Sequence, residues 1–504
     1  MDVDGKNIWA RKIVLNMSNI RNVAIIFGLF FLLGCDTISK NKEEKELPNI
    51  LFLFADDYTY DAIHALGNKV INTPNLDRLV NEGTSFTNAF NMGGWQGAVC
   101  IASRSMIISG RSLWNAKEIN DKWKKKENFE LAEQSWGKLM EKKGYKTYMS
   151  GKWHVSIDPN KVFQTVRNIK PGMPGDFFKK EFKKGYNRPI NEKDKSWIPY
   201  DSLNGGFWEG GKHWSEVLKD DALDFIDDAS NSDDPFFMYL AFNAPHDPRQ
   251  SPKSFLDQYP IENIPLPENW LPEYPNKEAI GNPKTLRDEA LAPFPRTPYA
   301  IKTHIKEYYA IITHLDQQIG EILAALKKSG KDKNTYIFFT GDHGLSVGRH
   351  GLLGKQSMFD HSIRVPLLIK GPDIPKKHKI EQEVYLQDIM ATSLELGNVK
   401  LPDSLEFNSL LSAAKGESQE KIYKNGIYGA YIDYQRMIRK DGFKLIVYPK
   451  IKKTVLFDLK NDPLEINDLS SNENYSKKKI DLFTGLQSLQ KKFGDPLDLT
   501  SLVP

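Results

Sequence analysis

The stretch Leu47-Pro48-Asn49-Ile50-Leu51-Phe52-Leu53-Phe54-Ala55-Asp56-Asp57 decides the fold class of this chain. Its apolar residues follow one another without polar alternation, which is typical of a strand buried on both faces of a parallel sheet. The run ends at two adjacent carboxylates, Asp56 and Asp57. The stretch therefore predicts a buried parallel strand with acidic side chains at its carboxyl end.

Three later runs share this pattern of a short apolar stretch that ends in polar residues: Tyr145–Ser150, Asp234–Phe242 and Tyr336–Thr340. The polar residues that close them are Lys152 with His154, His246, and Asp342 with His343. Helical stretches such as Glu307–Lys328 lie between the runs. This alternation indicates a parallel α/β sheet, in which ligands bind beyond the carboxyl ends of the strands. We therefore expect the four polar clusters to form a single site at one edge of the sheet.

The same reading divides the chain into two parts. Residues 48–400 are expected to form an α/β catalytic domain with a large, mostly parallel sheet sandwiched by helices. Within it, the stretch Pro248–Pro298 lacks periodicity, and we expect a long surface excursion that forms one lip of the cleft. Residues 401–504 are expected to form a smaller α+β subdomain. Its predicted elements are antiparallel strands at Tyr434–Ile438, Phe443–Tyr448 and Val455–Leu459, a turn at Asp441-Gly442 and a helix near Lys477–Phe493.

The N-terminus is expected to direct export. An apolar stretch at residues 23–33 follows basic residues, and its length suits a signal-peptide core better than a membrane span. Gly34-Cys35 then resembles a bacterial lipobox, so residues 1–34 are interpreted as a lipoprotein signal peptide, with Met17 as an alternative start. Cys35 would carry the lipid, and residues 35–47 would form a polar tether. The alternative is an uncleaved membrane anchor, and both readings place the protein in the cell envelope, at the outer membrane or facing the periplasm.

The composition of the chain argues against two properties: nucleic-acid binding and stabilisation of the fold by disulfides. The 504 residues include 69 basic and 65 acidic ones, and the resulting net charge of +4 gives no nucleic-acid footprint. The only two cysteines are Cys35 and Cys100, so disulfides are not expected to hold the fold together.

Asp56 and Asp57 suggest a metal site. Like charges this close repel one another unless a cation lies between them, and oxygen ligands suit a hard divalent ion. Asp342 and His343 occur in the same setting, which favours Ca²⁺ or Mg²⁺. The alternative is a strand-end pair of carboxylates that caps the following helix.

A second group of residues would make the site cationic. Arg104, Lys152 and Lys355, with His154 and His246, could stabilise a tetrahedral oxyanion such as sulfate or phosphate. Each residue alone also has an ordinary structural reading, as a solvated lysine or a buried core histidine. Cys100 could likewise be a small buried residue or a thiol nucleophile.

Together these segments resemble the type I, formylglycine-dependent sulfatases of the alkaline-phosphatase superfamily, and bacterial polysaccharide sulfatases among them. The segments that carry the resemblance, in the family's order, are Ala55-Asp56-Asp57, Thr73–Leu79, Cys100-Ile101-Ala102-Ser103-Arg104, Gly151–His154, Pro245–Pro248, Gly341–Gly344, and Lys355 with Arg364-Val365-Pro366. The segments 456–459 and 462–465 also match a common C-terminal pattern of the family. The resemblance therefore covers nearly the whole chain beyond the N-terminal signal, and its combination of motifs is specific.

The resemblance implies that a maturation enzyme oxidises Cys100 to formylglycine (3-oxoalanine), whose hydrate attacks sulfur. One calcium ion, with magnesium less favoured, would be held by Asp56, Asp57, Asp342, His343 and the modified Cys100. The remaining implied roles are these: Arg104 stabilises the hydrate, Lys152 and Lys355 bind sulfate oxygens, His246 protonates the leaving alcohol, and His154 assists turnover. Two positions depart from the commonest pattern, because Ala102 replaces proline and His343 replaces asparagine.

The substrate expected from the resemblance is a sulfated polysaccharide or oligosaccharide. A marine algal glycan such as ulvan or carrageenan is preferred, and a glycosaminoglycan is the second choice. Residues that we expect to contact the sugar are His213, Trp214, Arg249, Tyr434 and Arg436. Two other functions stay open: a formylglycine-dependent phosphonate or phosphoester hydrolase, and a catalytically inactive surface lipoprotein that binds glycans.

Overall fold

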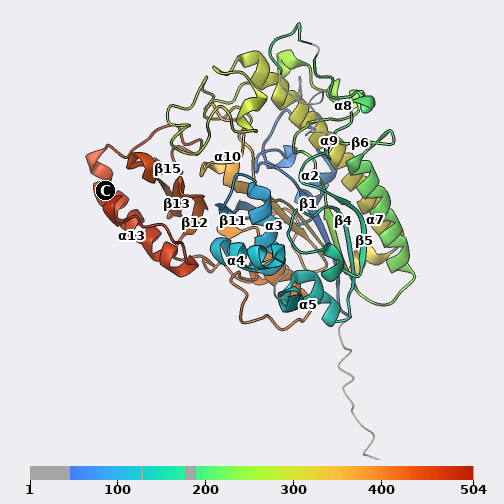
Figure 1. Cartoon of the computed structure of the whole chain (residues 1–504). Helices are drawn as coiled ribbons and strands as arrows, with labels where there is room; N and C mark the ends of the chain where they lie inside the picture. Colours follow the sequence, from blue (N-terminus) through green and yellow to red (C-terminus); the bar gives the residue numbers. More distant parts are fainter. Residues whose placement is uncertain (1–45, 126–128, 176–188, 195, 503–504) are drawn as a thin grey trace, which may run out of the picture. The chain divides into compact units, whose positions relative to one another are not determined.

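An eight-stranded sheet forms the centre of the protein, with strand order β11-β2-β10-β9-β1-β8-β4-β5 (Figure 1). Its strands are β1 (Asn49–Ala55), β2 (Thr84–Phe90), β4 (Lys146–Lys152), β5 (Thr165–Lys170), β8 (Phe236–Ala241), β9 (Thr335–Gly341), β10 (Arg364–Lys370) and β11 (His378–Tyr385). β1 pairs in parallel with β8 and β9, whereas β10 runs antiparallel to both β2 and β9. The prediction of a large, mostly parallel sheet is confirmed.

The computed structural model describes residues 46–125, 129–175, 189–194 and 196–502. The described residues from Leu47 onward belong to one compact unit. The expected signal peptide (residues 1–34), Cys35 and all but the last residues of the tether lie outside the described residues. In the part of the chain that is described, no helix is both long and apolar enough to cross a membrane.

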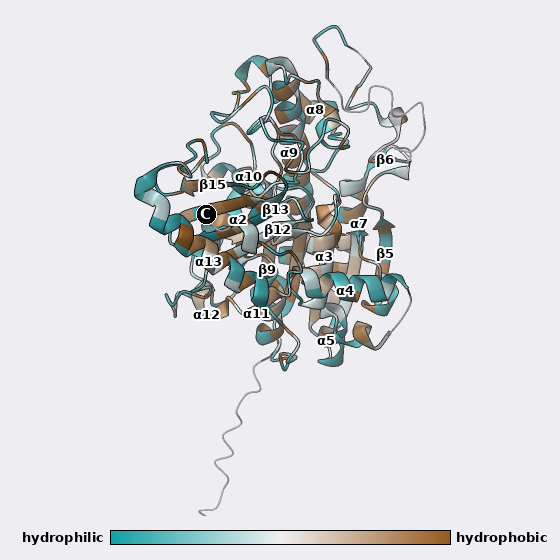
Figure 2. Ribbon diagram, turned by 60° about the vertical axis from the view of Figure 1, so that its left-hand side comes forward, coloured by the Kyte–Doolittle hydropathy of each residue, from teal (hydrophilic) through white to brown (hydrophobic). Residues whose placement is uncertain are grey.

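Strand β1 is buried on both faces, as its sequence predicts. Ile50, Phe52 and Phe54 point into one hydrophobic core, while Leu51 and Leu53 point into another. This follows from the two-residue period of a strand, and it explains why the run has no polar alternation. Figure 2 shows the same contrast, with apolar strands such as β9 inside and the largely hydrophilic helix α4 outside.

Helices cover both faces of this sheet. The first core contains residues of α2 (Pro74–Glu82), α7 (Trp214–Ser230) and α9 (Pro298–Lys328). The second contains residues of α3 (Val99–Ser109), α5 (Trp136–Lys142) and α11 (Asp388–Leu396). The other helices and short strands are α4 (Leu113–Lys124), α8 (Lys253–Leu256), α10 (Asp360–Ile363), α12 (Leu411–Ala414), β6 (Trp208–Glu209) and β7 (Lys212–His213).

Helix α9 begins nine residues before the predicted start at Glu307. Its true start has a recognisable cap, because the side chain of Thr297 accepts a hydrogen bond from the backbone N–H of Ala300. Pro298 then occupies the first turn, where its missing N–H costs no helical hydrogen bond. The apolar periodicity located the helix from Glu307 to its end at Lys328 and missed the first turns and this cap.

A smaller sheet lies at the C-terminal end of the chain. Its strands are β12 (Ile427–Tyr431), β13 (Gln435–Lys440), β14 (Phe443–Tyr448) and β15 (Lys453–Asp458), joined by β3 (Gly93–Gly94), and α13 (Ser476–Phe493) packs on it. Asp441 and Gly442 have φ values of 52° and 79°, which suit a tight hairpin turn between β13 and β14. β3 precedes Cys100 and pairs with β12, so this sheet reaches the loop that leads to Cys100. The antiparallel C-terminal strands and the final helix are confirmed.

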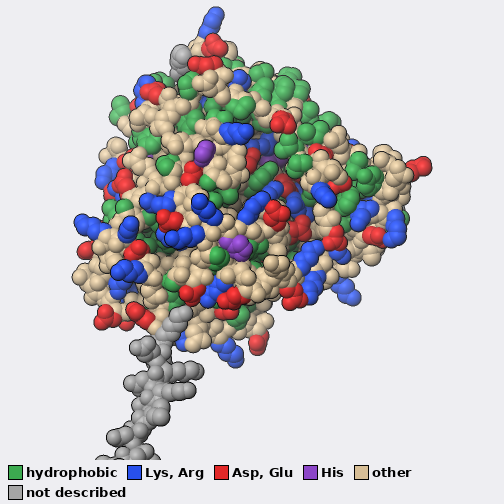
Figure 3. Space-filling view, turned by 180° about the vertical axis from the view of Figure 1, so that it is seen from behind, with side chains coloured by type: hydrophobic (Ala, Val, Ile, Leu, Met, Phe, Trp, Pro, Cys, Tyr) green, Lys and Arg blue, Asp and Glu red, His purple; other side chains and the backbone are tan. Residues whose placement is uncertain are grey.

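The Pro248–Pro298 stretch differs from the predicted surface excursion. It contains α8 and several single helical turns, and Asn269, Asn282 and Arg296 within it are buried. Arg296 donates hydrogen bonds to the backbone carbonyls of Glu289 and Ala292, which holds the stretch in place without regular secondary structure. On the outside of the molecule, basic and acidic side chains are interspersed over the face seen in Figure 3.

Candidate active site

The carboxyl ends of four neighbouring strands carry the residues predicted for the site. β9, β1, β8 and β4 are adjacent and parallel, so their carboxyl ends lie at the same edge of the sheet. The side chains at these ends are Asp342 and His343, Asp56 and Asp57, His246, and Lys152 and His154. The structure thus brings the four polar clusters to one place.

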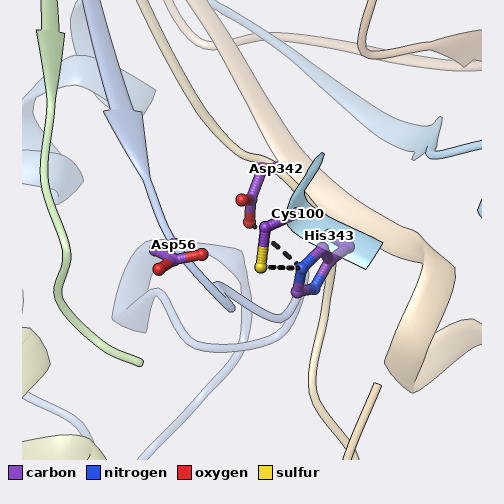
Figure 4. A group of neighbouring side chains, drawn as sticks. All are labelled: Asp56, Cys100, Asp342 and His343. Atoms are coloured by element: carbon purple, nitrogen blue, oxygen red, sulfur yellow. Dashed lines mark hydrogen bonds and ion pairs between the residues drawn. The ribbon is translucent and has the colours of Figure 1, made fainter. Parts of the chain in front are cut away.

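Cys100 enters this cluster from the first turn of α3. Its Sγ lies 3.1 Å from Nε2 of His343 (Figure 4). The same Sγ lies 3.2 Å from Nζ of Lys355. Burial and Asp56 oppose ionisation of the thiol, but Lys152 and Lys355 lower the pKa of Cys100 below its usual value. A buried group in a first helical turn, beside two cations, is well placed to carry developing negative charge.

The geometry of the cluster fits a bound cation. Two overlapping groups of side chains have ligand atoms within 4.8 Å of one another: Asp56, Cys100, Asp342 and His343, and Asp56, Asp57, Cys100 and His246. Oδ1 of Asp56 is buried and has no hydrogen-bond partner among the described residues. Nδ1 of His343 donates to the carbonyl of Gly344 at 2.9 Å, so Nε2 is the nitrogen that faces the carboxylates. A ligating imidazole is usually fixed in this way.

The electrostatics of the cluster point in the same direction. Burial raises the pKa of Asp57 to about 8, although Nζ of Lys355 donates to its Oδ1 at 2.8 Å. Burial alone would lower the pKa of His343, but Asp342, Cys100 and Asp57 raise it to about 9. The shift of Asp57 comes first from burial, with Asp56 adding to it, and the shift of His343 comes from the negative groups around it. A bound divalent cation would offset both effects by favouring the ionised carboxylate and the neutral imidazole. Carboxylate oxygens with one imidazole nitrogen suit Ca²⁺ or Mg²⁺.

Arg104 and Lys152 lie buried beneath the carboxylates. Arg104 Nε donates to Oδ2 of Asp342 at 3.0 Å, and Nη1 donates to the backbone carbonyl of Lys152 at 2.8 Å. The guanidinium also packs over the ring of Phe54, 4.6 Å from its centre. Lys152 Nζ bonds to Oδ2 of Asp56. Arg104 therefore holds the ends of β9 and β4 together and fixes two charged groups of the site.

His246 is oriented by the residue that follows it. Its Nδ1 donates to the carbonyl of Asp247 at 2.6 Å, and its Nε2 lies 3.8 Å from Oδ2 of Asp57. Burial and then Lys355 lower the pKa of His246 well below its usual value. Nε2 is therefore the nitrogen that can exchange a proton with a bound ligand.

His154 also lines the cavity and packs against Gly172. A Cβ atom at position 172 would lie 2.3 Å from the His154 ring, so a larger residue has no room there. Burial and the charge of Lys152 lower the pKa of His154 to about 3, which keeps the ring neutral. Its Nδ1 has no hydrogen-bond partner within the described parts of the chain.

A cavity of about 220 Å³ opens onto these groups. Cys100 and Lys355 line it together with His154 and His246, and its remaining wall includes Leu286–Asp288. A larger groove of about 930 Å³ lies beside β10 and β11 and is lined by other residues, so it is not the site of this chemistry. The cavity therefore presents the predicted nucleophile, two histidines and a lysine to one bound ligand.

Comparison with known proteins agrees with this geometry. Residues 48–399 match the family described as sulfatase, and residues 348–492 match the C-terminal part of N-sulphoglucosamine sulphohydrolases. The chain belongs to the sulfatase family. It is 31% identical to an arylsulfatase of Clostridium perfringens over 465 residues, covering 86% of this chain and 92% of the relative.

Two further comparisons extend this result. This sulfatase is 27% identical over 512 residues to an ulvan-active sulfatase of Formosa agariphila, covering 97% of this chain and 91% of the relative. A solved protein in complex with its substrate D-glucosamine-2-N,6-O-disulfate has the same fold, with a TM-score of 0.70 and 23% identity. That comparison covers 90% of this chain and 99% of the other. The expected alkaline-phosphatase-like architecture and the enzyme class, a sulfatase, are thereby established.

The residues expected to contact the sugar lie elsewhere in this sulfatase. His213 is fully buried, and its Nδ1 caps α7 by accepting from the backbone N–H of Ser215. Arg249 is also buried, and its Nη1 contacts Nδ1 of His304 at 2.6 Å. Neither belongs to the cavity lining. The structure therefore gives neither residue a contact with a sugar bound in this cavity, and their expected role finds no support.

The other three residues expected to contact the sugar also pack against other parts of the protein. Trp214 is partly buried against the first core, with Nζ of Lys170 5.0 Å from its ring centre. Arg436 is buried and paired with Asp495. Tyr434 packs on the C-terminal core, its ring 6.3 Å from that of Tyr431 and outside the described cavity lining.

Several residues that complete the site carry no direct signal in the sequence. Tyr308 in α9 donates to the backbone carbonyl of Asp57 at 2.6 Å, and Asn91 donates to that of Asp342 at 2.6 Å. Arg287 and Asp288 line the cavity from within the aperiodic stretch. Tyr308 and Asn91 act on backbone carbonyls, which carry no residue-type signature in the sequence.

Proposed function

We propose that this sulfatase hydrolyses a sulfate ester of a glycan and that Cys100, oxidised to formylglycine, supplies the nucleophilic hydroxyl. The observation that carries the proposal is the position of Cys100 in the cavity lining, with Sγ within 3.2 Å of both Lys355 Nζ and His343 Nε2. A serine- or thiol-type hydrolase would need a histidine base for this residue. Here the nearest imidazole instead belongs to the carboxylate cluster, which suits a metal-assisted nucleophile.

Ca²⁺ is the ion we propose for the cluster formed by Asp56, Asp57, Asp342, His343 and the modified Cys100. Calcium tolerates irregular coordination, whereas magnesium demands a near-ideal octahedron and gives up water reluctantly. When bound, the divalent ion supplies Lewis-acid stabilisation of negative charge on the sulfate oxygens.

The surrounding side chains would bind the sulfate, hold the site in place and transfer protons. Lys355, which lines the cavity, and Lys152, which is buried behind the lining against Asp56, would bind sulfate oxygens. Arg104 would hold the nucleophile's surroundings rigid from beneath. His154 would lie beside the bound ester. The negative charge of the bound sulfate would raise the pKa of His246, so that its Nε2 takes up a proton and donates it to the leaving alcohol.

A sulfated polysaccharide or oligosaccharide is the proposed substrate class. The ulvan-active relative aligns with 97% of this chain, which supports a glycan and favours a marine algal one over a glycosaminoglycan. The likeness of fold to a protein bound to a sulfated glucosamine is compatible with either choice.

Released sulfate, measured over a panel of defined sulfated sugars and one phosphonate ester, tests this proposal. Sulfate release from at least one sugar, with slower cleavage of the phosphonate, is the expected result. Faster phosphonate cleavage would assign a phosphonate hydrolase instead. If protein whose residue 100 is formylglycine binds glycans but does not turn them over, the enzyme proposal is wrong and the protein is a glycan-binding protein.

His246→Ala should slow hydrolysis of sugar sulfates by about 10²–10⁴-fold, because an alkoxide leaves poorly without a general acid. Aryl sulfates should be much less affected, since a phenolate leaves without protonation. Steady-state kcat for both substrate types checks this. Equal losses on both would assign His246 a structural role, and His378→Ala, at the edge strand β11, is a matched control away from the cavity.

We also propose that the protein is exported and anchored to the cell envelope through lipidated Cys35, and that a formylglycine-generating enzyme matures it. Partition of the native protein between membrane and soluble fractions, with and without Cys35→Ser, tests the anchor. Wild-type protein that stays soluble in its host would remove this part of the proposal.

A further inference from the structure

One wall of the catalytic cavity is formed by Leu286–Asp288 and Gln356. We infer that this cavity accepts a single sulfated sugar residue at the end of a glycan chain, and that Arg287 recognises the hydroxyl groups of that sugar. This inference rests on the proposed function as a glycan sulfatase. It specifies two properties, chain-end action and the residue that selects the sugar, that the sequence left open.

The size of the cavity supports a single sugar. Its volume is about 220 Å³, below the range of about 300–1,000 Å³ that is typical of ligand pockets. Part of this space must hold the sulfate beside Cys100 and Lys355. The remainder has room for one ring and not for several consecutive sugars of a polysaccharide.

The wall is closed by buried hydrogen bonds. Gln356 Nε2 donates to Oδ2 of Asp288 at 2.5 Å and to the carbonyl of Gly97 at 2.9 Å. The carbonyl of Gln356 accepts from Asn282 Nδ2 and from Gln435 Nε2, each at 2.9 Å. All four polar side chains are buried. These bonds join the wall to the C-terminal sheet through Gln435 and to the loop before Cys100 through Gly97, so on this side the bound sugar would be the end of its chain.

Arg287 is the partly exposed charged group of this wall. Its side chain is 25% exposed, and its guanidinium is held by Oδ2 of Asp247 at 2.5 Å and by Oδ1 of Asp288. A guanidinium fixed from two sides loses little side-chain entropy when it binds a ligand. The pair formed with Asp288 presents donors and acceptors together, which matches sugar hydroxyl groups that both donate and accept.

The local charge favours hydroxyl groups over a second anion. Arg287 directly contacts two carboxylates, Asp247 and Asp288, which offset its charge at this part of the wall. Arg249 also acts on Asp247 but does not line the cavity, and Lys355, which does, serves the sulfate. A carboxylate or second sulfate next to Arg287 would meet repulsion from the two aspartates. The sugar bound here is therefore a neutral ring that carries one sulfate.

Chain-end action is tested with one sulfated sugar presented in three ways: as a free monosaccharide, at the non-reducing end of an oligosaccharide, and inside the same oligosaccharide. The wild-type enzyme should cleave the first two with similar kcat/KM and the internal sulfate at least about 10-fold more slowly. Equal rates at the internal position would overturn the closed-wall inference. A failure of the proposed function looks different, because then none of the three presentations releases sulfate.

The role of Arg287 is tested with Arg287→Ala and a series of the same sugar sulfate lacking one hydroxyl at a time. A lost charge-assisted hydrogen bond should lower kcat/KM by about 10- to 100-fold. For the analogue that lacks the hydroxyl bound by Arg287, the kcat/KM values of the variant and the wild type should differ much less, because neither protein can form that hydrogen bond. An indirect effect through Asp247 and His246 would instead lower kcat/KM equally for every analogue, and that result would overturn the inference.

Lys284→Ala is the matched control. Lys284 lies on the same segment, its side chain is 53% exposed, and it lies outside the described cavity lining. It should leave kcat/KM unchanged on every sugar. A sugar with an added carboxylate completes the test: the wild-type enzyme should cleave it at least about 10-fold more slowly than the neutral sugar, and a preference for the acidic sugar would contradict the charge argument.

Discussion

Cys100→Ala is expected to lower kcat for sulfate release by at least about 10⁴-fold, because the substitution removes the group that attacks sulfur. The carboxylate cluster, Lys355 and Arg104 would remain, so the variant should still bind sulfated ligands. Cys100 is buried in the first turn of α3, where alanine is a good helix former and leaves only a small void. The loss should therefore appear in turnover and not in folding, and kcat with the thermal midpoint of unfolding measures both.

Ser109→Ala provides a control in the same helix. Ser109 lies at the C-terminal end of α3, and its Oγ donates to the backbone carbonyl of Ser105 at 2.6 Å. This variant should keep wild-type turnover. Peptide mass spectrometry of the wild-type protein should show an aldehyde at residue 100. A reduced thiol there in fully active protein, or appreciable activity in Cys100→Ala, would refute the nucleophile assignment.

The central sheet and the metal cluster could be predicted because the same residues specify both. A parallel strand buried on two faces must be apolar throughout, and its carboxyl end is the first place where a charge is tolerated. Asp56 and Asp342 stand at such ends on neighbouring strands, so the strand pattern alone brings them together. Burial and hydrogen bonding of each residue were then set by its neighbours in space.

The stretch Pro248–Pro298 was expected to form one lip of the cleft, and Leu286–Asp288 within it do line the cavity, but the individual residues of this wall could not be predicted. Arg287 and Asp288 belong to a stretch without regular periodicity, held by buried contacts such as Arg296 with Glu289. Contacts of this kind join residues through the tertiary structure, and no local spacing encodes them. The sequence does not predict β3 either, because its two glycines acquire strand geometry only by pairing with β12.

The expectations for His213 and Arg249 lack support for the same reason. Both residue types often contact sugars when exposed, and their exposure was assumed from their positions in the sequence. The fold buries both, one as a helix cap and one beside His304. Residue type indicates which chemistry is available, whereas exposure depends on long-range packing.

Removal of the divalent ion is expected to inactivate the enzyme, and Asp342→Asn should prevent recovery. Asp342 uses both oxygens, because Oδ2 accepts from Arg104 Nε at 3.0 Å and Oδ1 accepts from the backbone N–H of Asp57 at 3.1 Å. An amide keeps the shape but loses the charge and turns an N–H₂ group toward one of these donors. Metal content measured by elemental analysis should fall from about one ion per chain to none, and kcat should fall at least about 100-fold.

A stability measurement separates loss of the ion from loss of catalysis. After treatment with a chelator, wild-type protein given Ca²⁺ at about 100 times its Kd should gain about 2.7 kcal/mol of unfolding free energy, since the ion binds only the folded state. Asp342→Asn should gain nothing at the same concentration. Asp224→Asn changes an exposed aspartate of α7 that pairs with Arg167, so it should respond like the wild type. A Ca²⁺-dependent gain retained in Asp342→Asn would place the ion elsewhere, because a site built on this carboxylate cannot survive its neutralisation unchanged.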